Sequence, residues 1–135
     1  MVDNEYLIRG YIAEACTALA PGDRRCECVN AEIMRHDSLF ATAGVGKKLL
    51  NPANIRCIKP EDSVVPVSCV PSPQNGSFSS FKTLRDGTYA GVALYVKKYA
   101  GRHHESIVRI WAGNPQSKGY WEGVRSCFLP NPLAK

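Results

Sequence analysis

Residues 36–56, HDSLFATAGVGKKLLNPANIR, contain the residue types that bind phosphate, because Gly44 and Gly46 precede a pair of lysines. A phosphate-binding loop has the pattern G-x-x-x-x-G-K-[ST] and follows a buried strand, so that backbone N–H groups surround the phosphates and the hydroxyl holds magnesium. Here Ala41 stands at the first glycine position, Lys48 replaces the hydroxyl residue, and the preceding segment has a helical pattern. These departures exclude a nucleotide site.

The cysteines could form disulfides or hold a metal ion; they are Cys16, Cys26, Cys28, Cys57, Cys69 and Cys127. An even number in a small chain permits up to three disulfides in an oxidising compartment. The only close pair, Cys26 and Cys28, has one intervening residue where zinc sites have two to four, and no second pair follows. We therefore expect neither a metal nor a cofactor. Six cysteines allow fifteen connectivities, of which a bridge from Cys57 to Cys69 around a proline-rich loop is preferred.

Size and composition favour one compact domain spanning residues 1–135. The chain is 44% hydrophobic, enough for a core of its own, and 135 residues are too few for two ordinary domains. No run of eighteen apolar residues supports a membrane span. The first residues are acidic rather than basic, which does not match a secretory signal. Work outside the cytosol would then need a virion, a holin-dependent release or a removed leader.

The net charge of +5 favours anionic partners, because lysines and arginines are spread along the chain. Nucleic acid, cell-wall polymers and acidic lipids would all satisfy this charge, and so would a basic surface that is merely solvated.

Helical spacing of apolar residues predicts the elements that position these groups. Tyr6, Tyr11, Ala15 and Leu19 predict a helix over residues 4–20, capped by Asp3 or Asn4. A second helix starts near residue 23, carries Cys26, Val29, Asn30 and Ile33 on one face, and ends at residues 37–40, before the glycines. Residues 51–80 contain five prolines, so loops with short strands are expected there. Further helices are predicted over residues 86–99, 105–112 and 120–128.

Two ordered motifs give the segment from Asp37 a different interpretation. Asp37-Ser38-Leu39-Phe40-Ala41-Thr42-Ala43-Gly44-Val45-Gly46 resembles E-[ST]-G-x-G-T-S-G-x-G, and Asn51-Pro52-Ala53-Asn54-Ile55-Arg56 resembles N-N-P-x-N-[IM]-R. Both motifs belong to the lysozyme-like glucosaminidase group, which is glycoside hydrolase family 73. Phe78, Phe81, Thr83, Gly87, Ala90, Tyr99, Ile107, Trp111, Tyr120 and Val124 are similar to the later motifs of its small phage and bacterial relatives.

The resemblance covers residues 30–128 and implies a mainly α (α+β), lysozyme-like single domain with a small irregular or β lobe. It also implies cleavage of the glycan strand of peptidoglycan, by hydrolysis or lytic transglycosylation, in a phage lytic or virion-associated enzyme. Its binding partners would be peptidoglycan glycan strands, and other virion proteins are further candidate partners. We expect binding neither to nucleic acid nor to a membrane. The location would be periplasmic, extracellular or virion-associated. A non-catalytic virion or glycan-binding module and a secreted antibacterial effector are the alternatives.

The resemblance places Asp37 at the position of the catalytic glutamate. Glycosidic cleavage needs a carboxylic acid that protonates the leaving oxygen, and the negative end of a helix disfavours the ionised carboxyl. Aspartate is one methylene shorter than glutamate, so the backbone would have to compensate. Glu32 is the rival acid, although its spacing points it away from Asp37 and favours a pair with His36.

The remaining candidate residues follow from the same motifs. Tyr120 occupies the position of a late cleft tyrosine in the family. Asn54 and Arg56 are candidates for substrate binding or for bracing turns, because amides tie turns to backbone groups and an arginine pins a carboxylate or a sugar substituent. Phe81 and Trp111 are candidates for contacts with sugar rings, and a core position is the alternative for Trp111.

Overall fold

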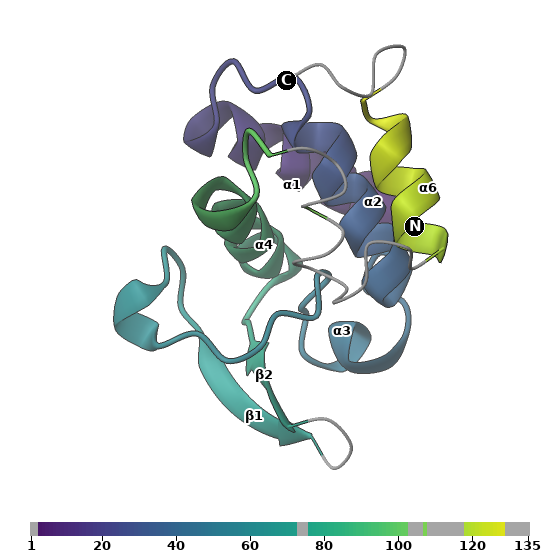
Figure 1. Cartoon of the computed structure of the whole chain (residues 1–135). Helices are drawn as coiled ribbons and strands as arrows, with labels where there is room; N and C mark the ends of the chain where they lie inside the picture. Colours follow the sequence, from purple (N-terminus) through teal and green to yellow (C-terminus); the bar gives the residue numbers. More distant parts are fainter. Residues whose placement is uncertain (1–2, 73–75, 103–106, 108–117, 129–135) are drawn as a thin grey trace.

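The computed structural model describes residues 3–72, 76–102, 107 and 118–128, and only the backbone of residues 72 and 118–121. The described chain is mainly helical with one small antiparallel sheet (Figure 1). Its elements are α1 Asn4–Leu19, α2 Cys26–Ser38, α3 Gly44–Lys48, a 3₁₀ turn Pro60–Asp62, β1 Ser68–Ser72, β2 Gly76–Ser80, α4 Leu84–Lys98 and α6 Lys118–Ser126. The predicted mainly α (α+β), lysozyme-like class with a small β lobe is confirmed.

Side-chain caps define the starts of two helices. The Asp3 carboxylate accepts a hydrogen bond from the Tyr6 N–H at 2.9 Å and so caps α1, as predicted. The Thr83 hydroxyl accepts from the Asp86 N–H at 3.0 Å and starts α4 two residues before the predicted position. Both caps satisfy backbone donors that the first helical turn leaves without partners.

The helices pack around a shared core in which α2 is central. Helix α2 contacts α1, α4 and α6, and α1 also packs along α4 (Figure 1). The largest fully buried apolar side chains are Ile8, Ile12, Val29, Ile33, Met34, Val92, Ile107 and Val124. Of the predicted helix over residues 105–112, only Ile107 lies within the described residues.

The predicted face of α1 is confirmed in part, because Ala15 is buried and Leu19 packs against the core. Tyr6 is 71% exposed, whereas Ile8 and Ile12 are buried. The sequence carries two apolar stripes around this helix, and the isoleucines are the ones buried in the core, because tyrosine can remain in contact with water. The predicted face of α2, with Cys26, Val29 and Asn30, is confirmed.

Strands β1 and β2 form a hairpin that projects from the helices (Figure 1). Val70 pairs with Phe78, and Phe78 also forms an isolated bridge with Arg56 on its other side. The segment before the hairpin is therefore attached as a short third edge. This agrees with the prediction of loops and short strands over residues 51–80.

Three disulfides connect the described elements. Cys57–Cys69 joins the loop to β1, which is the predicted bridge. Cys16–Cys26 joins the end of α1 to the start of α2, and Cys28–Cys127 joins α2 to the segment after α6. Among the described residues, no helix is both long and apolar enough to cross a membrane.

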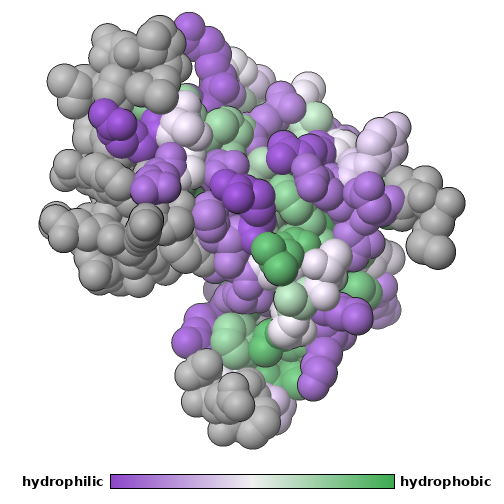
Figure 2. Space-filling model, turned by 90° about the vertical axis from the view of Figure 1, so that its right-hand side faces the viewer, coloured by the Kyte–Doolittle hydropathy of each residue, from purple (hydrophilic) through white to green (hydrophobic). Residues whose placement is uncertain are grey.

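The surface is largely hydrophilic on the face shown in Figure 2. Hydrophobic residues gather in the middle of this face and again near the hairpin, and hydrophilic residues surround both places. The apolar surface is therefore divided into small patches on this side, as is usual for folded chains.

Candidate active site

The chain leaves α2 through an unusual turn directly after Asp37 and Ser38. Leu39, Phe40 and Ala41 have φ angles of 50°, 56° and 60°, so three consecutive non-glycine residues are left-handed. Each such residue costs roughly 1–2 kcal/mol relative to a right-handed conformation. Residues 39 and 41 are glycine positions in the motif that this segment resembles. The backbone of this turn therefore has the left-handed conformation that glycine favours, although residues 39–41 include no glycine.

Buried hydrogen bonds hold this turn in place. The Ser38 hydroxyl, on a residue only 2% exposed, donates to the Pro52 carbonyl at 2.7 Å and accepts from the Ala41 N–H at 2.8 Å. The Asn54 amide donates to the Asp37 carbonyl at 2.7 Å. The backbone of Asp37 is thus fixed from the 51–56 segment, which compensates for the strain of the turn.

The 51–56 segment is itself anchored by Asn51, which is fully buried. Its amide oxygen accepts from the Ile55 N–H at 2.9 Å, and its amide nitrogen donates to the carbonyls of Ile55 and Ser79. Asn51 thereby connects this segment to β2. Gly46 of α3 lies so close that a Cβ there would meet the Ser38 Cβ and would lie 2.9 Å from the Asn51 carbonyl oxygen. Helix α3, which the sequence analysis missed, packs against this corner.

A hollow of about 490 Å³ lies where these segments meet α4 and the hairpin. Its lining residues are Asp37, Ala53, Asn54, Ile55, Arg56, Cys57, Phe78, Leu94, Lys98 and Tyr99. Three residues singled out from the sequence, Asp37, Asn54 and Arg56, therefore lie around one hollow. Asp37 is half-buried and supplies the only carboxylate among these lining residues.

Asn54 is oriented as a brace rather than as a ligand for the hollow. Its amide nitrogen bonds the Asp37 carbonyl, and its amide oxygen is buried without a hydrogen-bond partner among the described residues. That oxygen would lie 3.0 Å from a Cβ on Gly46, so it faces α3. Asn54 is itself left-handed, with φ of 49°, a conformation that asparagine tolerates.

Phe78 lines the hollow, whereas Phe81 does not. Phe81 is 5% exposed, belongs to the hydrophobic core and is absent from the lining of the hollow. Phe81 follows the last residue of β2, and its N–H donates to the Leu49 carbonyl at 3.0 Å, so it packs toward the segment before residue 51. The guanidinium of Arg56, an exposed residue, lies 4.5 Å from the Phe78 ring centroid. Arg56 thus covers the edge of the hairpin beside the hollow.

Tyr99 is a lining residue to which the sequence analysis gave no role in the site. It is 4% exposed, and burial, together with the nearby Asp37 carboxylate, raises the pKa of Tyr99 to about 12. Its phenol therefore stays protonated at neutral pH and keeps a hydrogen-bond donor. Its match to a tyrosine of the later motifs was the available signal. The side chains of Tyr120 and Trp111 lie outside the described residues.

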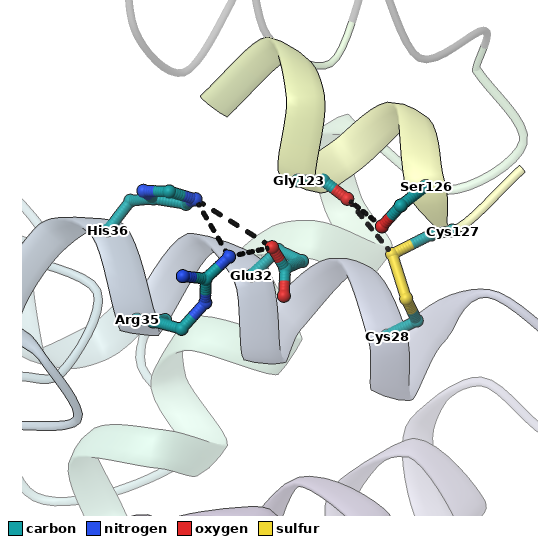
Figure 3. Close-up of polar contacts among 7 residues, drawn as sticks. All are labelled: Cys28, Glu32, Arg35, His36, Gly123, Ser126 and Cys127. Atoms are coloured by element: carbon teal, nitrogen blue, oxygen red, sulfur yellow. Dashed lines mark hydrogen bonds and ion pairs between the residues drawn. A yellow bond between two sulfur atoms is a disulfide. The ribbon is translucent and has the colours of Figure 1, made fainter. Parts of the chain in front are cut away.

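Glu32 lies on another side of α2, under α6 (Figure 3). Its carboxylate forms a salt bridge with Arg35 at 2.5 Å and lies 3.7 Å from the His36 ring nitrogen. A Cβ on Gly123 of α6 would meet the same carboxylate. The expected pair with His36 is confirmed, and Glu32 does not line the hollow with Asp37.

The described lining of the hollow contains side chains that could donate a proton, form hydrogen bonds and pack against a polar ring. It combines one carboxylate at the end of a helix, a neutral phenol, two cationic side chains and a phenylalanine. No group of three or more metal-ligating side chains occurs in the described part of the chain.

Comparisons with known proteins identify the fold. No family model matches the chain, and no curated protein matches it. A chain in the structure of a type VI secretion system effector–immunity complex from Pseudomonas protegens matches with a TM-score of 0.61 and 12% identity, over 93% of this chain and 89% of that one. The catalytic domain of the autolysin Auto from Listeria monocytogenes matches with a TM-score of 0.51 and 10% identity, over 95% of this chain and 84% of that one. At identities this low, the similarity shows that the chain has the same fold as these two proteins.

Proposed function

We propose that this protein cleaves the glycan strand of peptidoglycan, with Asp37 as the general acid. The observation that carries the proposal is the place of Asp37, which is half-buried at the end of α2 and faces a hollow shared with Arg56 and Tyr99. In the first step Asp37 protonates the leaving oxygen of the glycosidic bond, a step common to hydrolases and lytic transglycosylases. The phenol of Tyr99, which lines the same hollow, stays neutral at neutral pH.

The other candidate residues take supporting roles in this proposal. Arg56 contacts substituents of the sugars, and Asn54 holds the backbone of Asp37. Glu32 is a structural residue, because its carboxylate is engaged by Arg35 and His36 under α6 (Figure 3). Tyr120 and Trp111 remain proposed cleft residues on the strength of the motifs alone.

The two similar structures support this function. One is named as the catalytic domain of an autolysin, and the other belongs to an effector–immunity complex of a secretion system. Three disulfides fit work in an oxidising compartment such as the periplasm or the outside of the cell. A phage lytic or virion-associated enzyme and a secreted antibacterial effector share the same chemistry, and a neighbouring immunity gene would mark the effector.

Incubation with purified peptidoglycan, followed by mass analysis of soluble fragments, tests the proposal. The native chain is expected to release fragments, and Asp37→Asn to lose about a hundredfold or more of the rate, because amides cannot donate the proton. Glu32→Gln is the matched control and should keep most of the activity. An unimpaired Asp37→Asn would contradict the role of Asp37, and the absence of fragments from the native chain would contradict the enzyme.

A non-catalytic glycan-binding module of the same fold is the second candidate. It is favoured by one observation, namely that an aspartate supplies the only carboxylate among the lining residues of the hollow and stands where the resembled motif has glutamate. Binding to peptidoglycan without any release of fragments would support this candidate.

A further inference from the structure

Two cationic side chains of the hollow have no task in the acid chemistry of Asp37. Arg56 comes from the segment before the hairpin, and Lys98 comes from the last turn of α4. When the Asp37 carboxyl is protonated, as the proposed function requires, these two residues leave the described lining with two positive charges. A neutral sugar chain would need no such charge.

The position of Arg56 is fixed by its surroundings. Its backbone forms the bridge to Phe78, and its carbonyl accepts a hydrogen bond from the Ser79 hydroxyl at 2.9 Å. The Cys57–Cys69 disulfide holds the next residue to β1. The Cζ atom of its guanidinium lies over the Phe78 ring, 4.5 Å from the ring centroid. The planar guanidinium of an arginine can bind a carboxylate through two parallel hydrogen bonds.

Lys98 approaches the hollow from α4. It is exposed, whereas the neighbouring Tyr99 is buried and is influenced by the Asp37 carboxylate. The Lys98 carbonyl accepts a hydrogen bond from the Arg102 side chain at 2.6 Å, which holds the end of the helix. Lys97 precedes it, is also exposed, and does not line the hollow. Two adjacent lysines therefore differ in whether they can reach a ligand there.

We propose that the hollow recognises a carboxylate carried by the glycan, through Arg56 and Lys98, and so selects acid-bearing strands over neutral polymers of N-acetylglucosamine. This inference rests on the proposed function for its choice of polymer. The carboxylate has two sources in peptidoglycan, namely the lactyl group of a sugar whose peptide has been removed, and the acidic residues of an attached peptide.

Binding of matched-length ligands to Asp37→Asn, in which cleavage is expected to be about a hundredfold slower or more, tests this selectivity. The ligands are a chitooligosaccharide, peptidoglycan strands stripped of peptides by an amidase, and strands with peptides attached. We expect at least one acidic ligand to bind about tenfold more tightly than the neutral one at low salt, and this preference to decline as salt screens the charges. Preference for stripped strands alone identifies the lactyl carboxylate, and preference for intact strands alone identifies the peptide.

The charge variants assign the preference to the two residues. Arg56→Gln and Lys98→Gln should each reduce it by about two- to fivefold, the range for exposed ion pairs, and Lys97→Gln should leave it unchanged. Equal binding of all three ligands would overturn the inference, as would an equal loss in Lys97→Gln. Failure of the proposed function is distinguishable, because the native chain would then release no fragments while the binding preference persisted.

Discussion

At the scale of single residues, protonation of the His36 ring is coupled to the stability of the fold. Its ring lies near the carboxylate of Glu32 and under α6 (Figure 3), with 21% of the side chain exposed. Burial lowers the pKa of His36 below its ordinary value of 6.5, the Arg35 guanidinium adds to the lowering, and Glu32 opposes it. The unfolded chain therefore takes up this proton at a higher pH than the folded chain does.

This difference predicts that the protein becomes less stable as the pH falls. The contribution of His36 is fully present above about pH 6.5 and is lost as the pH falls from there through the folded pKa. The free energy of unfolding, measured with urea at about pH 7.5 and about pH 5.5, should fall less on acidification in His36→Gln than in the native chain. An identical decrease in both proteins would exclude His36 as the source.

At the scale of elements, the joint between α4 and the loop before Asn54 depends on one glycine. A Cβ on Gly87 would meet the carbonyl oxygen of Leu50 and would lie 3.1 Å from the Pro52 ring. Backbone atoms cannot move aside as the end of a side chain can. Gly87 therefore allows the first turn of α4 to pack directly on the segment that leads to the hollow.

Gly87→Ala should destabilise the protein by about 1–3 kcal/mol, because it overpacks this joint. Gly10 of α1 is the matched control, since it is exposed and a Cβ there would meet nothing within 4 Å. Gly10→Ala should stabilise the protein by about 0.5–1 kcal/mol through helix propensity. Urea unfolding of the two variants measures both effects, and equal changes in the same direction would refute the packing at Gly87.

The elements also show what the sequence could and could not predict. Periodicity, caps and prolines located α1, α2, α4, α6 and the hairpin region to within a few residues, because these signals are local. The short helix α3 was missed, since its glycines favour a break in a helix, whereas in the fold Gly46 packs closely on Ser38, Asn51 and Asn54. Phe81 was predicted to contact sugars, whereas its side chain belongs to the hydrophobic core, because a motif does not tell which side chains the fold buries.

The motifs predicted part of the hollow but not its α4 wall. Asp37, Asn54 and Arg56 lie within one continuous segment, so the resemblance could bring them together. Lys98 and Tyr99 come from a helix distant in sequence, and their approach to Asp37 depends on how α4 packs against α2. A motif match at Tyr99 therefore did not indicate that this residue would lie near Asp37.

At the scale of the whole molecule, the three disulfides differ mainly in the length of chain that they close. Cys28 and Cys127 are 99 residues apart, whereas Cys57 and Cys69 are 12 apart. Three of these four cysteines are exposed and Cys127 is partly buried, so removing either bridge sacrifices little packing. The entropy that each bridge removes from the unfolded chain should therefore decide its effect.

Removal of Cys28–Cys127 by paired Cys→Ser substitutions should cost about 4–5 kcal/mol, and removal of Cys57–Cys69 about 3 kcal/mol, because the longer loop restricts the unfolded chain more. Urea unfolding of the two double variants at one pH gives both values. The larger loss should be accompanied by loosening of α6 from α2, which hydrogen exchange of the Val124 amide would detect, since Val124 is 1% exposed in the native chain. An equal or smaller loss for the long-range bridge would mean that α6 is held by the packing of Gly123 over Glu32 and His36 rather than by the disulfide.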